Sequence, residues 1–267
     1  MTAGTTRELE AAIEAVRDGL ALARRGDGFD QVTAKAGVDI VTAADVAVED
    51  AMRAVLRARC PEIAIVGEER GGSAGAGAYW LIDPICGTRN FASQLGLYAT
   101  NLALVEGAMP VLGVVGDGST GRVYAARSGE RAFSAGAARS PLQARDGSVI
   151  ALELAGKPPF DGPPEGLGRF IARLATDGRH YVRLLGSTLP LAKLACGDLA
   201  AVVLLGSGVH EPLHTVAGCV LAEAAGAIVT GAGGEPWTLE TATLVAAATA
   251  ELHATLLRHL SDCSLAG

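Results

Sequence analysis

Apolar residues recur at helical spacing in two segments near the start of the chain. From Glu8 to Leu22 the apolar positions 9, 13, 16 and 20 lie three or four residues apart, which is the spacing of one face of a helix. A second pattern of this kind, over positions 48, 52, 55 and 56, follows Thr42, a residue type that often caps a helix. The pattern predicts two amphipathic helices, followed by a short strand at residues 63–66.

Further along, the spacing of apolar residues changes twice. Short apolar runs separated by Gly, Asn and Asp predict an antiparallel series of strands at residues 80–82, 98–105, 111–115, 122–126 and 131–133. After a segment rich in Pro and Gly at residues 157–168, expected helices at 167–175, 189–196 and 213–225 alternate with expected strands at 182–185, 200–205 and 227–230. We therefore expect two subdomains, an α+β subdomain over residues 1–145 and an α/β subdomain over residues 146–267.

Composition narrows the class of protein. With 267 residues, 49% apolar and 19% charged, the chain can bury a sizeable core. Its formal net charge of −7 argues against a general nucleic-acid surface. The amino-terminal segment contains acids where a signal peptide needs apolar residues, and no apolar run approaches the length of a membrane helix. We expect a cytoplasmic protein that acts on a small molecule, with neither nucleic acid nor membrane as partner.

The five cysteines do not form a recognisable framework. Their number is odd, and no two of them have C-x-x-C spacing, which argues against a set of disulfides and against a zinc knuckle. A reducing compartment fits this pattern best.

The densest chemical signal is the segment WLIDPICGTRNF at residues 80–91. An apolar strand ends at Asp83, and Gly87 and Thr88 open a turn into a helix. A carboxylate at a strand end beside exposed backbone N–H groups suits a metal ion and a phosphate together. Glu68 and Asp45 place further carboxylates just after apolar runs. Hard oxygen ligands from separate segments are what magnesium requires.

These motifs resemble those of the inositol monophosphatase family of magnesium-dependent, lithium-sensitive phosphatases. The family carries an aspartate in a V-T-x-x-D run, a G-E-E sequence, the box W-I-D-P-I-D-G-T-x-N-F, and a late W-D before an E-A-G-G helix. The resemblance covers roughly residues 8 to 250 and includes the segments at 113–117, 123–133 and 183–187. It implies an α/β fold, a layered α/β/α/β/α sandwich, and a homodimer.

The resemblance also implies roles for individual residues. Glu68, Asp83 and the carbonyl of Ile85 would hold a first magnesium ion, Thr88 would belong to the pair that activates water, and Asp45 would assist from outside the ligand shell. The substrate-binding residues would be those that hold phosphate or contact the rest of the ligand: the N–H groups of Gly87 and Thr88, together with Arg89, Ser187 and His210. Arg89 could equally be a surface residue, His210 a structural residue under the pocket, and Ser187 part of a plain helix cap.

Two positions depart from the family pattern. Cys86 stands where the family box has its second aspartate, and Leu213 where the late W-D has its aspartate. In the family, the two aspartates that these residues replace are ligands of a second magnesium ion. Because one carboxylate at about 4 Å attracts a dication by roughly 8 kcal/mol at an effective dielectric near 20, we expect the second site to be lost and the chain to use either no metal or a single magnesium ion.

Cys86 admits three interpretations. In the family geometry its side chain would face the segment that carries His210, Glu211 and His214, so a neighbouring imidazolium could activate it as a nucleophile. It could also be a small residue tolerated after a ligand was lost, or one ligand of a soft-metal site with histidine.

Three hypotheses about function follow from these residues. The first is an enzyme repurposed to acid–base or thiol chemistry on a small molecule, such as a biosynthetic intermediate, with Asp83, Glu68, Thr88, Cys86 and His214 as catalytic residues. Asp83 or Glu68 would be its general acid, because crowded carboxylates raise one another's pKa. The second is a weak magnesium-dependent phosphomonoesterase. The third is a protein that binds a ligand without catalysis. We favour the first.

Overall fold

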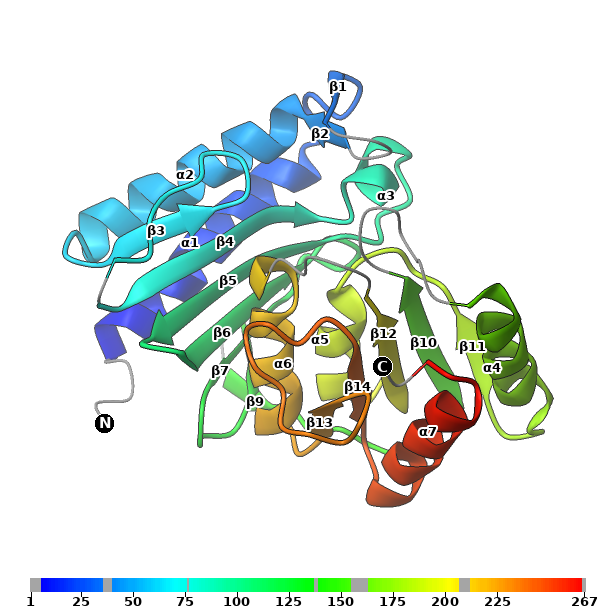
Figure 1. Ribbon diagram of the computed structural model, residues 1–267. Helices are drawn as coiled ribbons and strands as arrows, with labels where there is room; N and C mark the ends of the chain where they lie inside the picture. Colours follow the sequence, from blue (N-terminus) through cyan, green and yellow to red (C-terminus); the bar gives the residue numbers. More distant parts are fainter. Residues whose placement is uncertain are drawn as a thin grey trace.

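The structure is a computed structural model that describes residues 6–35, 40–75, 77–136, 139–154, 163–206 and 212–265. Helices and sheets alternate in five layers: two helices, a seven-stranded sheet, two helices, a five-stranded sheet and two outer helices (Figure 1). The expected α/β/α/β/α sandwich is therefore confirmed.

The first layer consists of the two predicted amphipathic helices. Helix α1 spans Thr6–Arg24 and α2 spans Ala43–Arg59. Thr42 caps α2 as expected, and its side chain and that of Asp45 each accept a hydrogen bond from the other residue's backbone N–H, a capping box. This arrangement buries the Asp45 carboxylate completely at the start of α2.

The seven-stranded sheet lies under these helices. Its strands are β3 (Ala64–Gly67), β4 (Tyr79–Cys86), β5 (Ala99–Glu106), β6 (Met109–Asp117), β7 (Val123–Arg127), β8 (Phe133–Ala135) and β9 (Arg139–Pro141), in that spatial order. Strands β3 and β4 are parallel and the others antiparallel, so the predicted antiparallel series is confirmed. A separate hairpin joins β1 (Val32–Ala34) to β2 (Ile40–Thr42).

The middle helical layer packs on the other face of this sheet. It contains α5 (Leu189–Ala195) and α6 (Val216–Ala224). The single helix expected at 213–225 is wrong at its start, because a 3₁₀ turn, η1 (Pro212–His214), precedes α6 and Thr215 separates the two. The short helix α3 (Thr88–Ala92) follows β4 at the edge of the seven-stranded sheet (Figure 1).

The five-stranded sheet has the order β11-β10-β12-β14-β13, formed by Tyr181–Arg183, Val149–Leu154, Ala201–Leu205, Leu244–Ala247 and Ile228–Gly231. Its pairs are mixed, parallel for β10 with β11 and β12 and antiparallel for β14 with β12 and β13. The outer helices α4 (Pro164–Thr176) and α7 (Ala250–Asp262) complete the molecule. Strands β1, β9, β10 and β14 and helix α7 were not predicted from the sequence.

The change from one sheet to the other falls between the end of β9 at residue 141 and the start of β10 at residue 149. The two halves nevertheless share packing, because buried residues of β4 to β7 and of α5 and α6 form one apolar cluster. Among the described residues, no helix is both long and apolar enough to cross a membrane.

Candidate active site

The site lies at the carboxyl end of β4. The register between β4 and β5 shifts between Asp83 and Cys86, and such a bulge re-aims side chains that would otherwise alternate across the strand. Gly87 then turns the chain into α3 with φ of 97°, a left-handed conformation that favours glycine. A Cβ atom on Gly87 would lie 2.7 Å from the Cβ of Ser187, so the β4–α3 turn and residue 187 are in tight contact.

Asp83 and His214 form an ion pair across the site, in which the carboxylate is buried and the imidazole is partly exposed. The Oδ2 atom of Asp83 lies 2.8 Å from Nδ1 of His214, and Asp83 has no exposed surface. Burial opposes protonation of the imidazole, but the negative charge of Asp83 and the hydrogen bond to it raise the pKa of His214 well above its usual value. The other oxygen of Asp83, Oδ1, has no hydrogen-bond partner among the described residues.

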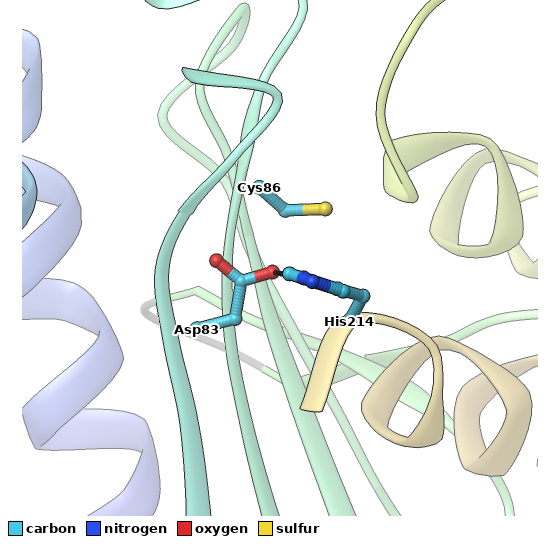
Figure 2. A group of neighbouring side chains, drawn as sticks. All are labelled: Asp83, Cys86 and His214. Atoms are coloured by element: carbon cyan, nitrogen blue, oxygen red, sulfur yellow. Dashed lines mark hydrogen bonds and ion pairs between the residues drawn. The ribbon is translucent and has the colours of Figure 1, made fainter. Parts of the chain in front are cut away.

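Cys86 lies beside this pair (Figure 2). Its Sγ is 2.9 Å from Oγ1 of Thr188, and the backbone N–H of Thr188 donates to Sγ at 3.4 Å. Burial and the charge of Asp83 raise the pKa of the thiol to about 11, although hydrogen bonds with His214 and Thr188 act in the opposite direction. Without a metal the thiol is therefore neutral at physiological pH, which does not favour the nucleophilic interpretation of Cys86.

Asn101, on β5, connects the members of this group. Its Nδ2 donates to Oγ1 of Thr188 and to the carbonyl of His214, both at 3.0 Å, and lies 3.5 Å from Oδ2 of Asp83. An amide nitrogen carries two protons, so the contact with Asp83 is the weakest of the three. Asn101 is buried and fixes η1 against the end of β4.

Glu68 contributes a second carboxylate next to Asp83. Burial, followed by the charge of Asp83, raises the pKa of Glu68 to about 8. Lys35 partly offsets this crowding, because its Nζ lies 3.1 Å from Oε1 of Glu68 and 2.7 Å from Oε1 of Glu69.

Thr88 and Asp45 form a hydrogen-bonded pair on the α2 side of the site. The hydroxyl of Thr88 lies 3.1 Å from Oδ1 of Asp45 and 3.1 Å from the carbonyl oxygen of Ile85, and its single proton can be donated to either acceptor. Burial raises the pKa of Asp45 to about 6, although hydrogen bonds from Thr42 lower it. Asp45 is thus largely ionised at neutral pH and able to accept a proton.

The segment that carries Ser187 and Thr188 is held from two sides. The buried carboxylate of Glu153, on β10, accepts hydrogen bonds from the N–H groups of Leu185 at 3.0 Å and Gly186 at 2.6 Å. From the opposite side, Nδ2 of Asn90 donates to the carbonyls of Leu97, at 2.8 Å, and of Leu185. These bonds fix the approach of the segment to Gly87.

The sequence matches a known protein family over nearly its whole length. The model of the inositol monophosphatase family matches residues 3–265. The chain belongs to the inositol monophosphatase family.

Individual members of the family resemble the chain over most of its length. It is 33% identical over 234 residues to inositol-1-monophosphatase ImpA of Mycolicibacterium smegmatis, covering 84% of this chain and 81% of the relative. It is 30% identical to the 3'(2'),5'-bisphosphate nucleotidase CysQ of Escherichia coli K12, covering 77% and 81%. The solved structure of Thermotoga maritima IMPase TM1415 superposes with a TM-score of 0.82 at 25% identity, covering 96% and 98%.

Most residues that the family resemblance assigned to the site lie together. Glu68, Asp83, Ile85, Thr88 and Asp45 meet at the ends of β3 and β4 and the start of α2. His214, whose direction the sequence left open, lies in η1 rather than in the first turn of a helix, and its imidazole contacts Asp83. Leu213 is buried in the apolar cluster between the sheets.

The structure bears on the alternatives left open for Arg89 and Ser187. Arg89 is exposed on α3, and within the described part of the chain Lys35 and His214, not Arg89, form the ion pairs with Glu68 and Asp83. Ser187 lies against Gly87, and its Oγ also accepts from the N–H of Leu189 at 3.3 Å. The expected roles of His210 and Glu211 lie outside the described residues.

Sequence reasoning missed four residues that shape the site: Lys35, Asn90, Asn101 and Glu153. Thr188 stands out beside Ser187 in the sequence, but its contact with Cys86 was not expected. Two of the four missed residues carried a signal. Asn101 and Glu153 are polar residues inside strands that are otherwise apolar, and a polar residue in such a strand is usually hydrogen-bonded in the core. Lys35 and Thr188 are brought to the site only by the tertiary fold.

The residues present fit a magnesium ion. Glu68, Asp83 and the carbonyl of Ile85 are hard oxygen donors, and Asp83 Oδ1 is a buried acceptor to which no described residue donates. Burial and then the charge of Asp83 raise the pKa of Glu68, and a cation would stabilise two such neighbouring carboxylates.

Proposed function

We propose that the chain is a magnesium-dependent phosphatase that hydrolyses a phosphate monoester of a small molecule. The observation that carries this proposal is the assembly of Glu68, Asp83, Thr88 and Asp45 at one edge of the seven-stranded sheet, with the buried Oδ1 of Asp83 unpartnered among the described residues. The relatives support the same class of reaction, since one is named an inositol-1-monophosphatase and another a bisphosphate nucleotidase.

Glu68, Asp83 and the Ile85 carbonyl are the residues that would hold the ion. Magnesium, when bound, neutralises phosphate charge and lowers the pKa of a coordinated water. Two carboxylates and a carbonyl leave room for substrate and water, in keeping with the reluctance of magnesium to lose all its water. We infer a single magnesium ion, because Cys86 and Leu213 offer no hard oxygen side chain at the second position.

Thr88 and Asp45 supply the acceptor for the proton of the attacking water. The Thr88 hydroxyl donates to Asp45 Oδ1, which orients the hydroxyl oxygen so that a lone pair is free to accept a hydrogen bond from water. Asp45, with its pKa raised to about 6, is a stronger base than an exposed aspartate yet still ionised at neutral pH.

The remaining residues surround the expected position of the substrate. The N–H groups of Gly87 and Thr88 begin α3 and can donate to phosphate oxygens. Ser187 and Arg89 lie on neighbouring segments and remain our candidates for contacts with the rest of the substrate. We retain a homodimer as a further expectation from the family.

Repurposed acid–base or thiol chemistry, which the sequence alone favoured, has less support. The comparisons point to phosphatases and a nucleotidase, and the neutral, fully buried thiol of Cys86 is poorly suited to nucleophilic attack. The pKa of Glu68, raised to about 8, is the single feature in favour of a general acid, and a bound cation would account for the same carboxylate.

Phosphate release tests the proposed function. We would measure release from inositol 1-phosphate, a 3',5'-bisphosphate nucleotide and an aryl phosphate after removal of metals, with and without added magnesium. We expect release that requires magnesium and falls at least about 100-fold in Glu68→Gln, since even loss of a residue behind a metal ligand costs 10- to 100-fold. The control is Glu69→Gln, which removes a neighbouring charge and should cost less than about tenfold. Absence of magnesium-dependent release from all three esters would contradict the proposal.

A further inference from the structure

Three side chains of types that bind metals converge at the end of β4, and one of them, Asp83, is also a proposed magnesium ligand. One ligand atom each from Asp83, Cys86 and His214 lies within 4.8 Å of the other two. Figure 2 shows that Asp83 and Cys86 project from the end of β4 toward the ring of His214, which lies in η1. Cys86 is therefore not an isolated thiol, because it belongs to a convergent group of carboxylate, thiol and imidazole.

We propose that Asp83, Cys86 and His214 form a zinc site, separate in ligand chemistry from the magnesium site. Thiolate and imidazole are ligands that zinc prefers, whereas magnesium binds hard oxygen atoms. Cysteine, histidine and aspartate are all zinc ligands, and catalytic zinc sites use three protein ligands and leave the fourth position for water or substrate.

The distance between the Asp83 and His214 donors is close to that in a zinc site, and Sγ of Cys86 lies within 4.8 Å of both. Tetrahedral zinc with the usual bond lengths separates its nitrogen and oxygen ligands by about 3.3 Å and sulfur from nitrogen by about 3.6 Å. The Asp83–His214 pair is 2.8 Å apart, so these two side chains need to separate by only about half an ångström to admit the ion. His214 keeps 33% of its side chain exposed, which leaves an access route and an open coordination position.

Neighbouring residues already orient the three donors. Thr188 approaches Sγ with both its backbone N–H and its hydroxyl, and these two groups can donate together to a thiolate. Asn101 contacts Oδ2 of Asp83 and anchors the carbonyl of His214. Such hydrogen bonds from outside the ligand shell fix ligand orientation in metal sites.

Asp83 can serve both ions. Its Oδ2 makes the contact with His214, and its Oδ1 has no partner among the described residues, so each oxygen is available to a different cation. Metals that share a carboxylate in phosphatases lie about 3.5–4 Å apart. The zinc site does not depend on the proposed function, because its ligands can bind the ion whether or not a phosphate ester is hydrolysed.

Cobalt substitution tests the zinc site directly. We would remove metals from the full chain and titrate it with Co²⁺, whose bond to a thiolate gives a near-ultraviolet charge-transfer band, and then displace Co²⁺ with Zn²⁺. We expect one equivalent to produce the band and one equivalent of zinc to abolish it. Cys86→Ser should eliminate the band, and His214→Gln should weaken binding at least tenfold with the band retained at saturation.

Two controls separate this site from other cysteines and from the magnesium site. Cys196→Ser removes a thiol at the end of α5, and Glu68→Gln removes a magnesium ligand; both should keep the band. X-ray absorption of the zinc-loaded wild type, which needs no variant to fold, should show one sulfur at about 2.3 Å. The proposal is overturned if the wild type shows no saturable band, if the band survives Cys86→Ser, or if the zinc shell contains no sulfur.

Discussion

At the scale of single residues, the site depends on buried polar groups that satisfy one another. The Nδ2 atom of Asn101 donates hydrogen bonds to Oγ1 of Thr188 and to the carbonyl of His214, and makes a weaker contact with Oδ2 of Asp83. Its neighbour on β5, Thr100, is equally buried, but its hydroxyl has no partner among the described residues. Of these two adjacent buried polar side chains, Asn101 is hydrogen-bonded, whereas the Thr100 hydroxyl is not bonded to any described residue.

We expect Asn101→Leu to lower the free energy of unfolding by about 1–3 kcal/mol, because it leaves buried acceptors without their donor. Thr100→Val, which replaces an unpartnered hydroxyl by a methyl group of similar shape, should change the free energy by less than about 1 kcal/mol or raise it. Urea unfolding of both variants measures these values. Equal losses in the two variants would show that the Asn101 hydrogen bonds do not contribute to stability.

The site residues that the sequence could predict are those that lie close together along the chain. Asp83, Cys86 and Thr88 lie within six residues of one another, so one motif reveals them. Lys35 follows β1 and Thr188 precedes α5, and each reaches the site only through the tertiary fold, because no local pattern places either of them beside Glu68 or Cys86. The effect of burial on the Cys86 pKa also required the packed structure, since the sequence does not show how completely a thiol is enclosed.

At the scale of elements, helix α2 carries Asp45, a residue of the candidate site, in its first turn. Thr42 caps the helix, and its N–H and hydroxyl both donate to Oδ2 of Asp45. Thr249 caps α7 by accepting from the N–H of Leu252 at 3.3 Å, far from the site. The two caps thus perform the same structural task, and one of them also holds a residue of the site.

Thr42→Ala and Thr249→Ala should each lower the free energy of unfolding by about 0.5–2 kcal/mol, as loss of a helix cap commonly does. Only Thr42→Ala should alter the pH dependence of phosphate release. The hydrogen bond from the Thr42 hydroxyl favours the ionised form of Asp45, so its loss raises the pKa of Asp45 above about 6 and reduces activity near pH 6–7, with recovery at higher pH. Identical pH–rate profiles for the two variants would contradict a role for Asp45 as proton acceptor.

Most elements with a strong periodic pattern were predicted, but helix α7 was missed although its buried positions 252, 256 and 260 have helical spacing. Helices α1 and α2 have a long amphipathic face, and β4 to β7 are separated by turn residues. Strand β14 and most of β10 are short apolar runs buried within the five-stranded sheet, and such runs do not distinguish strand from helix. The break between η1 and α6 was missed because the apolar pattern of residues 213–225 continues across it.

At the scale of the whole molecule, helix α6 joins the two sheets. It packs on β6 and β7 on one side and on β13 on the other. Helix α6 and strand β6 are in tight contact at Gly113, where an added Cβ atom would lie 2.5 Å from the carbonyl oxygen of Ala217. Because η1, which carries His214, directly precedes α6, this packing also sets the distance between His214 and Asp83.

The shared packing predicts that the two sheets unfold together. In a Trp237→Phe variant, the fluorescence of buried Trp80 reports the seven-stranded sheet, and hydrogen exchange of β12 and β14 reports the five-stranded sheet. We expect the two denaturation midpoints to coincide.

Gly113→Ala tests the cause of this cooperativity. It should lower both midpoints together, because the added methyl group meets backbone that cannot move without displacing α6. Gly168→Ala is the matched control: it lies on the outer helix α4 with no atom near the added Cβ, and it should stabilise the protein by up to about 1 kcal/mol. Separate midpoints for the two sheets would mean that they fold as independent units, and the position of His214 opposite Asp83 would then depend on contacts other than the packing of α6.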